Sequence, residues 1–462
     1  MSRKPRLEDI DGRRDFLKQA ALGLGAAALG PLGARSSEAA IGTNGADFVA
    51  PALPVVRIGF VGVGGMGMVH VENLLRIEGA EIRAVCDIVP EKVAAAQATL
   101  EAAGRPRPRG YSRGPRDFER MIGEEALDIV YNATPWEWHV PISLAALRHG
   151  RHAATEVPAA VTLDQCWELV ETAEKTRRYC IMMENCCYGR REMAMLNMVR
   201  QGVLGELLHA ECGYLHDLRE IKFARESEGL WRRAHSQHRN GNLYPTHGLG
   251  PVAQCLDINR GDRLEHLVSM SSNSRGLRLY ASEHLPEGDP RRAETFALGD
   301  VNVSLIRTVR GRTIVLSHNC DSPRPYSRVS LLQGTRGIAS GYPDRAYIES
   351  RGEPHEWQDL EGLYPEFEHP LWRIPRVADE HSGHGGMDFL EDWRLIAGLV
   401  NGVPMDMDVY DAATWSCISE LTERSVAGRS KRVDVPDFTR GRWRSRPPIG
   451  IAPAVEASAF RS

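Results

Sequence analysis

Gly62, Gly64 and Gly67 are spaced as Gly-x-Gly-x-x-Gly, where an apolar strand pattern ends and an amphipathic helix pattern begins. In such a pattern the first glycine permits a tight turn, the second lets backbone approach a pyrophosphate, and the third lets helix and strand pack closely. The amino end of the helix also attracts anions. These residues, with Gly65 and Met66 between them, predict the phosphate-binding turn of a dinucleotide site.

Asp87 ends the next strand pattern, Glu81–Asp87, about 20 residues after the last glycine. A carboxylate at this position accepts hydrogen bonds from the ribose hydroxyls of NAD, whereas it would repel the 2′-phosphate of NADP. We therefore predict NAD as the cofactor.

Three polar segments follow predicted strands, at the sheet edge where ligands of an open parallel sheet bind. They are Thr134–His139, Thr155–Pro158 and Glu184–Tyr188. Each segment alone is equally compatible with helix capping and ordinary loop chemistry. Together they surround the expected nicotinamide position.

The second half of the chain offers Tyr214, Arg232, the cluster Tyr244–His247 and Tyr326. A tyrosine, a threonine and a histidine within four residues can offer a sugar several polar contacts, and histidine is the commonest proton-transfer group near neutral pH. The alternative is that the histidine is a satisfied core residue and that the tyrosines only pack.

The elements that must position these residues alternate between strand and helix up to residue 183. Strand patterns at Leu127–Asn132, His152–Glu156 and Tyr179–Met183 are separated by helix patterns that end near Gly150 and Thr176. Short connections between alternating strands and helices predict a doubly wound parallel sheet of the Rossmann type, in an α/β protein.

After Glu184 several strand patterns follow one another without helices between them, which predicts an α+β domain on a largely antiparallel sheet. We expect long surface loops at 279–295 and 342–376, and helices at 387–400 and 409–427. The predicted division of the chain is 1–40 an export signal, 41–54 a linker, 55–183 an NAD-binding domain, 184–443 a substrate domain and 444–462 a tail.

The export signal is predicted from Arg13 and Arg14, which precede a mild apolar run, Ala20–Gly30, and then small residues. This arrangement is typical of the twin-arginine route, so we expect a periplasmic or secreted protein. The apolar run is too short and too rich in glycine for a stable membrane anchor.

The composition argues against a nucleic-acid partner, a disulfide framework and a metal site. A formal charge of −4, with 42% hydrophobic and 26% charged residues, gives no reason to expect a nucleic-acid partner. The nine cysteines include no Cys-x-x-Cys pair, so we expect buried thiols rather than a disulfide framework or a metal site.

Longer stretches of the chain, from about Val55 to Trp443, closely resemble glycoside hydrolase family 109, the NAD-dependent α-N-acetylgalactosaminidases of the oxidoreductase superfamily that includes glucose-fructose oxidoreductase. The stretches that carry this resemblance are Trp136–His139, Glu184–Tyr188, Leu196–Arg200, Tyr244–Gly248, Asp257–Gly261, Arg324–Tyr326 and Gly383–Asp388. Many sugar dehydrogenases of the superfamily have Glu-Lys-Pro where this chain has Glu156-Val157-Pro158. The missing lysine disfavours a simple dehydrogenase.

The resemblance implies a glycosidase that hydrolyses terminal α-N-acetylgalactosaminides through transient oxidation at the sugar C3. The C3 ketone acidifies the C2 proton, the C1 substituent is eliminated, water adds, and the hydride returns, so NAD is unchanged at the end. Other glycosidases instead place two carboxylates across the scissile bond.

The resemblance also implies residue roles. His247 would transfer the proton at the C3 hydroxyl, Tyr188 would act as base or acid near C2, and Tyr326 and Glu156 are further catalytic candidates. The residues implied to bind the sugar are Tyr214, Arg232, Tyr244, Pro245, Thr246, His247 and Tyr326. The residues expected to hold NAD are Gly62, Gly64, Gly65, Met66, Gly67, Asp87, Pro135, Trp136, Glu137, Trp138, Thr155, Glu156 and Asn185.

Three alternatives remain: a net NAD-dependent sugar oxidoreductase, an exported sugar-binding protein with a vestigial nucleotide site, and a two-carboxylate glycosidase using Glu184, Glu211 or Asp217. The expected partners are a carbohydrate with a terminal amino sugar and, through an exposed sheet face, a second copy of the chain.

Overall fold

The computed structural model describes residues 48–349, 351–374 and 383–451. The predicted export signal at 1–40 therefore lies outside the described residues, as do the first part of the linker and the end of the tail. Within the described ranges, no helix is long and apolar enough to cross a membrane.

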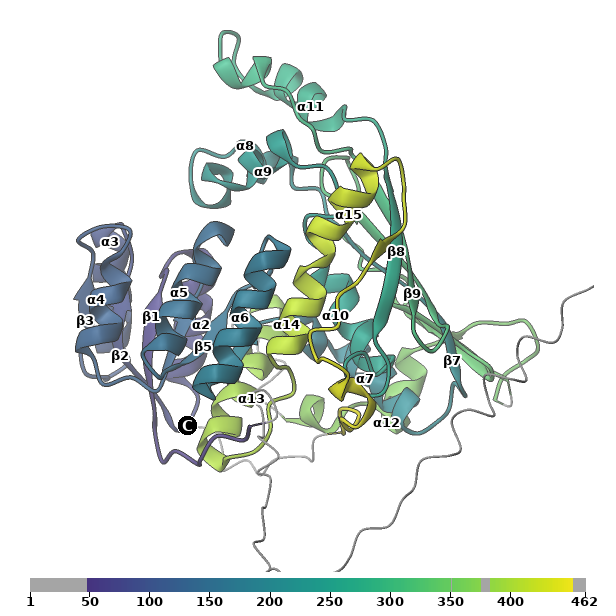
Figure 1. Ribbon diagram of the computed structural model, residues 1–462, viewed down its shortest axis with the longest axis horizontal. Helices are drawn as coiled ribbons and strands as arrows, with labels where there is room; N and C mark the ends of the chain where they lie inside the picture. The colour runs from purple at the N-terminus through teal and green to yellow at the C-terminus, as the bar shows by residue number, and fades with distance from the viewer. Residues whose placement is uncertain (1–47, 350, 375–382, 452–462) are drawn as a thin grey trace, which may run out of the picture. The chain divides into compact units, whose positions relative to one another are not determined.

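A six-stranded parallel sheet forms the first half of the chain, in the order β3-β2-β1-β4-β5-β6 (Figure 1). Its strands are β1 (Val56–Val61), β2 (Ala80–Cys86), β3 (Arg109–Tyr111), β4 (Ile129–Asn132), β5 (His152–Thr155) and β6 (Cys180–Met182). The helices between them are α2 (Gly65–Leu75), α3 (Pro90–Ala102), α4 (Asp117–Glu124), α5 (Trp136–Arg148) and α6 (Leu163–Thr176). All residues of β4 and β5 are buried, as expected for strands covered by helices on both faces. The predicted doubly wound sheet is confirmed.

A nine-stranded sheet forms most of the second half, in the order β14-β13-β12-β11-β7-β10-β9-β8-β15. Its strands are β7 (Leu207–Leu215), β8 (Leu264–Ser271), β9 (Asn302–Thr308), β10 (Thr313–Asn319), β11 (Leu331–Gly334), β12 (Gly337–Ser340), β13 (Arg345–Ile348), β14 (Gln358–Asp359) and β15 (Val433–Asp434). The pairing is antiparallel, as predicted, except between β7 and β10, which run parallel. Several helices and two strands lie between β7 and β10 along the chain. A connection of this length allows β10 to run parallel to β7.

The helices of the second half range from four to 15 residues in length. They are α7 (Arg190–Arg200), α8 (Arg219–Phe223), α9 (Arg232–His238), α10 (Thr246–Cys255), α11 (Gly276–His284), α12 (Tyr364–Phe367), α13 (Met387–Asn401), α14 (Val409–Ser416) and α15 (Ile418–Ala427). Short 3₁₀ turns complete the set: η2 (Asn185–Tyr188), η3 (Ser227–Leu230), η4 (Pro290–Ala293), η5 (Glu361–Leu363), η6 (Pro370–Arg373), η7 (His384–Gly386) and η8 (Arg442–Arg444).

Two expected loops are partly ordered elements, so those expectations were wrong. The 279–295 segment begins inside α11, because Leu277 and Ala281 lie one turn apart and bury themselves against Phe223. The 342–376 segment contains β13, β14 and α12, whose apolar residues are too few to give a clear period in the sequence. The predicted helix at 409–427 is two helices, which meet at Cys417.

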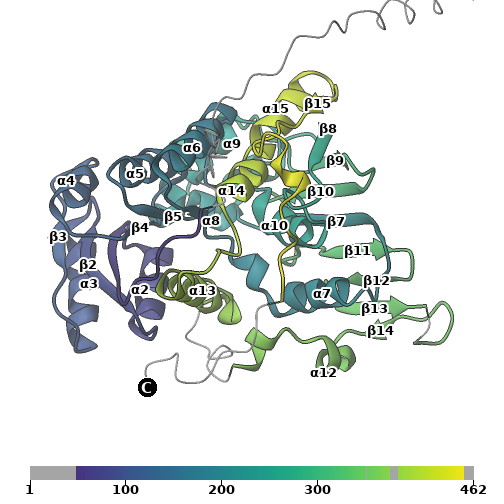
Figure 2. The same ribbon diagram turned by 60° about the horizontal axis from the view of Figure 1, so that its bottom comes forward.

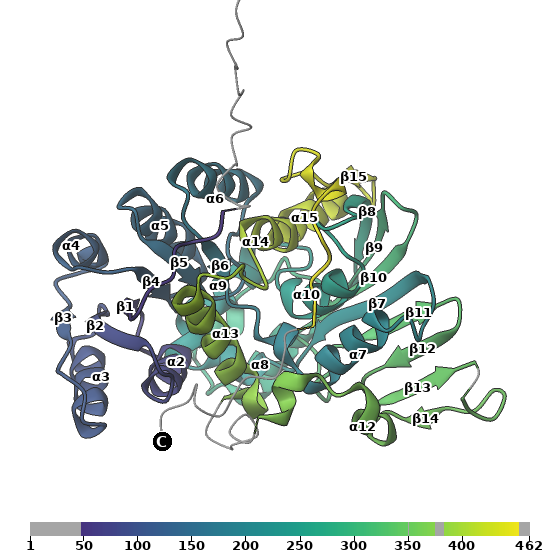
Figure 3. The same ribbon diagram turned by 90° about the horizontal axis from the view of Figure 1, so that it is seen from below.

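Two C-terminal helices return to the parallel sheet. Helix α13 packs against α2, and α14 packs against α6 and β6 (Figures 2 and 3). Helices α10 and α15 cover one face of the nine-stranded sheet. Among the described residues, no helix covers the opposite face (Figure 3). The last helices therefore contact both sheets, and they close the space between them.

Candidate functional site

The glycine turn after β1 has the close approaches that the sequence predicts. Gly62 has a φ of 84°, in the left-handed region that favours glycine. A Cβ on Gly67 would lie 1.9 Å from the carbonyl oxygen of Gly62, so only glycine fits there. Around Gly65, in contrast, no atom lies within 4 Å of such a Cβ, which leaves room for a ligand at the amino end of α2.

Asp87 stands at the carboxyl end of β2 and holds this turn in place. Its Oδ2 accepts a hydrogen bond from the Val63 amide at 3.1 Å, and its Oδ1 accepts one from the Val89 amide at 2.9 Å. Each oxygen keeps a second lone pair, which can accept a ribose hydroxyl. The geometry fits the adenosine half of NAD.

A cavity of 440 Å³ runs along the carboxyl ends of the parallel strands. Of the residues predicted to hold NAD, it is lined by Gly62, Gly64, Gly65, Met66, Asp87, Pro135, Trp136, Glu137, Trp138 and Glu156. Thr155 is fully buried, and its hydroxyl accepts a hydrogen bond from Asn132, so it supports the cavity from behind. We call this space the cofactor cavity.

A second cavity, of 660 Å³, lies between the two sheets and is lined by Asn185, Tyr214, His247 and Tyr326 from the predicted set. We call it the substrate cavity. Tyr244 and Arg232 line the cofactor cavity instead. The rings of Tyr244 and His247 are 4.8 Å apart, and those of Tyr244 and Tyr214 are 4.7 Å apart, so one aromatic wall joins the two cavities.

Neither Pro245 nor Thr246 lines a cavity. Both are buried, and the Thr246 hydroxyl has no hydrogen-bond partner among the described residues. Their place is structural: Thr246 begins α10, the helix that carries His247.

His247 is oriented by a buried acid. Its Nδ1 is 2.7 Å from Oε1 of Glu184, whose side chain is completely buried, and this leaves Nε2 for a ligand in the substrate cavity. Glu184 follows β6, whereas His247 lies in the first turn of α10, so the pair joins the parallel sheet to the second half of the chain. A carboxylate in this position fixes the ring and stabilises the imidazolium that forms when the ring takes a proton.

Cys186 lies close to the same pair. Ligand atoms of Glu184, Cys186 and His247 all lie within 4.8 Å of one another, which would suit a metal ion. Glu184 Oε1, however, already accepts from His247 and from the Cys186 amide. These hydrogen bonds account for the arrangement without an ion.

Tyr326 presents its hydroxyl to the substrate cavity with an arginine behind it. Arg328 donates to the Tyr326 hydroxyl at 3.0 Å and to the buried Glu192 at 2.8 Å. Burial raises the pKa of Tyr326, although the charge of Arg328 opposes this. The phenol therefore stays neutral near pH 7 and can donate a proton or a hydrogen bond.

Sequence reasoning missed two histidines of the substrate cavity. Nδ1 of His216 lies 3.0 Å from the hydroxyl oxygen of Tyr214. Burial, together with the charge of Arg232, lowers the pKa of His216. Nδ1 of His384 lies 2.8 Å from Oδ2 of Asp388, and this hydrogen bond raises the pKa of His384. His216 lies two residues after Tyr214, so strand alternation could have placed both on one face, and Gly383–Asp388 was among the stretches that carried the resemblance.

Asn185, which we expected to hold NAD, lies beside His384 and Asp388. Its Nδ2 donates to Oδ1 of Asp388 at 2.6 Å, and it lines the substrate cavity rather than the cofactor cavity. Asn185 can therefore reach only a part of the cofactor that extends toward the substrate.

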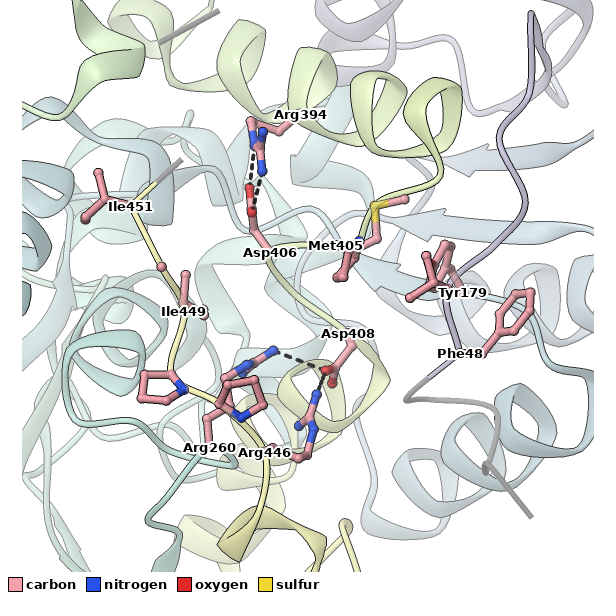
Figure 4. Close-up of a pocket in the computed structure, with 15 residues that line it drawn as sticks. Phe48, Tyr179, Arg260, Arg394, Met405, Asp406, Asp408, Arg446, Ile449 and Ile451 are labelled. Carbon is pink, nitrogen blue, oxygen red and sulfur yellow. Dashed lines mark hydrogen bonds and ion pairs between the residues drawn. The ribbon is translucent and has the colours of Figure 1, made fainter. Parts of the chain in front are cut away.

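Tyr188 is not brought to either cavity. Its hydroxyl donates to Asp406 at 3.1 Å, and burial raises its pKa well above the usual value. Asp406 is in turn paired with Arg394, at 2.7 and 2.8 Å (Figure 4). The geometry thus disfavours Tyr188 as the C2 base, because its hydroxyl contacts this partly buried ion pair instead.

The Asp406–Arg394 pair lines a third cavity, of 440 Å³, near the described start and end of the chain. Its other arginines are also paired with acids: Arg260 and Arg446 both contact Asp408 (Figure 4). The charges of this cavity are therefore balanced within the protein.

Two family models together cover most of the described chain. Residues 56–184 match the oxidoreductase family, NAD-binding Rossmann fold, and residues 188–445 match glycosyl hydrolase 109, C-terminal domain. The fold and the cofactor cavity therefore define an NAD-binding enzyme of the oxidoreductase superfamily.

Sequence relatives narrow this class. The chain is 47% identical over 448 residues to a glycosyl hydrolase family 109 protein of Shewanella amazonensis, covering 95% of this chain and 98% of that protein. It is 48% identical over 447 residues to a family member of Solibacter usitatus, covering 96% and 100%. The chain belongs to glycosyl hydrolase family 109.

Solved structures share the fold at lower identity. A levoglucosan dehydrogenase in complex with NADH and L-sorbose has a TM-score of 0.64 at 19% identity, covering 83% of this chain and 100% of that one. An inositol dehydrogenase homologue of Azotobacter vinelandii, complexed with NAD⁺, has a TM-score of 0.63 at 18% identity, covering 85% and 99%. The open space at Gly65 and the free lone pairs of Asp87 fit the same cofactor here, which is NAD.

Proposed function

We propose that the protein hydrolyses terminal α-N-acetylgalactosaminides by transient oxidation at the sugar C3, followed by elimination, water addition and re-reduction. The observation that carries this proposal is the Glu184–His247 pair, which lies on the aromatic wall shared by the cofactor and substrate cavities. A sugar bound there would have a proton acceptor on one side and the cofactor on the other. Bound NAD supplies a hydride acceptor that also returns the hydride.

His247 takes the proton of the C3 hydroxyl as that carbon becomes a ketone. The ketone acidifies the C2 proton, whose removal expels the C1 substituent, so one bond from carbon to hydrogen and one from carbon to oxygen break. Water then adds at C1, and C2 regains a proton.

His216, kept neutral by its lowered pKa, is suited to accept the C2 proton. His384, whose pKa is raised, and the neutral phenol of Tyr326 are suited to donate a proton to the leaving group. These assignments replace Tyr188, whose hydroxyl contacts Asp406.

Val157 stands where many sugar dehydrogenases have a lysine, and it is buried. The absence of an ammonium group there favours a redox-neutral cycle over net alcohol oxidation.

Turnover of an aryl α-N-acetylgalactosaminide in deuterated water tests the proposal. We expect phenol release, deuterium at the sugar C2 and no net NADH. Replacing His247 with Ala should abolish all turnover while NAD still binds. Accumulation of NADH without phenol would instead make the protein a sugar oxidoreductase, and full turnover by the His247→Ala protein would remove the central role of this histidine.

We also propose that the protein is exported by the twin-arginine route and forms homo-oligomers through the uncovered face of the nine-stranded sheet. Arg13 and Arg14 support export. Replacing both with Lys should keep the protein in the cytoplasmic fraction, and unchanged export would refute this route.

A further inference from the structure

A row of three hydrogen-bonded side chains, two of them buried, passes behind the cofactor cavity. His70 of α2 lies with Nδ1 2.9 Å from both oxygens of Asp392 on α13, and with Nε2 2.8 Å from Oε1 of Glu156, which follows β5. His70 and Asp392 are inaccessible to solvent, whereas Glu156 keeps 18% of its side chain exposed, in the cofactor cavity. This row of side chains therefore begins in the core at Asp392 and ends at the cofactor cavity with Glu156.

The contacts of His70 define its protonation state. A neutral imidazole has one N–H, but here both ring nitrogens face a carboxyl group, and two ionised carboxylates are satisfied only when both nitrogens donate. Burial raises the pKa of Asp392, and the charge and hydrogen bond of His70 oppose this. Burial alone would lower the pKa of His70, but the charge of Asp392 and the hydrogen bonds to Asp392 and Glu156 raise it well above its usual value. For Glu156, burial would raise the pKa, but His70 lowers it. Glu156 is therefore an ionised carboxylate.

Other titratable groups near this row of side chains do not compete for His70. Glu391 of α13 is buried without a hydrogen bond among the described residues, and burial raises its pKa well above the usual value, so it is neutral. Asp388 is paired with His384. The remaining groups that face these side chains are Tyr131 of β4, His139 of α5 and Tyr244. Burial is the main cause of their pKa shifts: it raises the pKa of both tyrosines and lowers the pKa of His139.

Glu156 lies at the end of the cofactor cavity opposite Asp87. In a doubly wound sheet the first βαβ unit holds the adenosine half of the dinucleotide, here at β1 and β2, and the other half extends across β4 and β5. Glu156 immediately follows β5 and lines the cavity with Trp136 and Tyr244. It therefore belongs to the nicotinamide side.

We propose that His70, anchored by Asp392, is a positioning residue that holds Glu156 as a fixed carboxylate beside the nicotinamide, so that the site binds oxidised cofactor in preference to reduced cofactor. The nicotinamide ring is positively charged only when oxidised, and a buried, fixed anion stabilises that charge. This preference concerns the cofactor alone. Its use rests on the proposed function, in which each cycle begins and ends with NAD⁺.

The test measures dissociation constants of NAD⁺ and NADH from pH 6 to pH 8, without sugar. The wild type should prefer NAD⁺ equally across this range. His70→Gln removes the cation, so burial should raise the pKa of Glu156. The preference should then fall about tenfold at pH 6 and partly recover as the pH rises and Glu156 ionises.

Two further variants make the test specific. Glu156→Gln should lose the preference at every pH, and adding His70→Gln to it should change nothing more, because His70 acts through Glu156. His152→Gln is the matched control: this buried histidine lies at the other end of β5 and accepts from the Tyr179 amide, far from this row of side chains. It should keep the wild-type preference.

An unchanged preference and pH profile in His70→Gln would overturn the proposal, as would an equal effect of His70→Gln with and without Glu156→Gln. Because these measurements need no glycoside, they are independent of the proposed function. A protein that binds both cofactor forms as expected but releases no phenol would refute only that function.

Discussion

Two imidazoles of the substrate cavity are each held by a buried carboxylate. Glu184 orients His247, and Asp388 orients His384. A buried carboxylate keeps the ring in one rotamer and stabilises its protonated form, so the same ring can take a proton early in a cycle and return it later. This reversibility is what a redox-neutral reaction requires of its acid and base groups.

Replacing Glu184 with Gln should lower kcat about 10²–10⁴-fold, with little change in KM, because the amide keeps the shape of the side chain but not the charge that stabilises the imidazolium. Steady-state kinetics with the aryl glycoside would measure this. The control is Glu211→Gln, since Glu211 is a half-exposed acid of β7 that contacts neither cavity. Equal kinetics in the two variants would show that Glu184 does not act on His247.

At this scale the sequence predicted the residues whose role depends on local spacing. The glycine turn, Asp87 and His247 were found because each is placed by the strand or helix beside it. Arg232 and Tyr244, which we expected to bind the sugar, line the cofactor cavity, and the Tyr188 hydroxyl contacts Asp406, because side-chain direction depends on packing between distant elements. The same holds for His384, which only the assembled fold brings to the site, whereas His216 directly follows the strand that carries Tyr214.

Among the elements, the β1–α2 unit carries the most constraints. Its turn must admit the cofactor, its helix must pack within reach of the Gly62 carbonyl, and the same helix presents His70 to Glu156. The strand and helix pattern predicted this unit well, since its apolar period is strong. The patterns were weaker for α11 and β13, which bury only two apolar side chains each.

Gly67→Ala should destabilise the protein by about 2 kcal/mol or more and abolish NAD binding, because its methyl group would overlap the Gly62 carbonyl and push α2 off the sheet. The matched control is Gly123→Ala at the end of α4, where an added Cβ meets no atom within 4 Å. This substitution should raise the stability of the protein slightly, because alanine favours a helix more than glycine does. Denaturant unfolding and NAD titration would measure both. Normal NAD affinity in Gly67→Ala would contradict the tight packing of α2.

For the whole molecule, the uncovered face of the nine-stranded sheet is a regular surface without a partner among the described elements. Met270 and Val303 are cross-strand neighbours on it, and Leu305 lies between Val268 and Val315. Met270 and Leu305 are 66% and 55% exposed, although each lies on a strand that is paired on both sides. A second copy of the same face would cover them.

Leu305→Glu should weaken self-association by at least about tenfold, because it would put a charge into the apolar centre of such an interface. Sedimentation at several concentrations would measure the dissociation constant. Leu279→Glu is the control, since Leu279 is equally exposed but lies on α11, away from the sheet. A monomeric wild type, or equal effects of both substitutions, would rule out this interface.

The return of α13 and α14 to the parallel sheet also bears on how the chain can be recombined. Asp392 anchors His70, the Ser416 hydroxyl accepts from the Ala159 amide, and Tyr410 donates to Glu174. A graft that exchanged residues 48–184 alone would therefore lose the acid behind His70 and expose one side of α6. The transplantable cofactor module is discontinuous, and it must carry residues 387–416 with it.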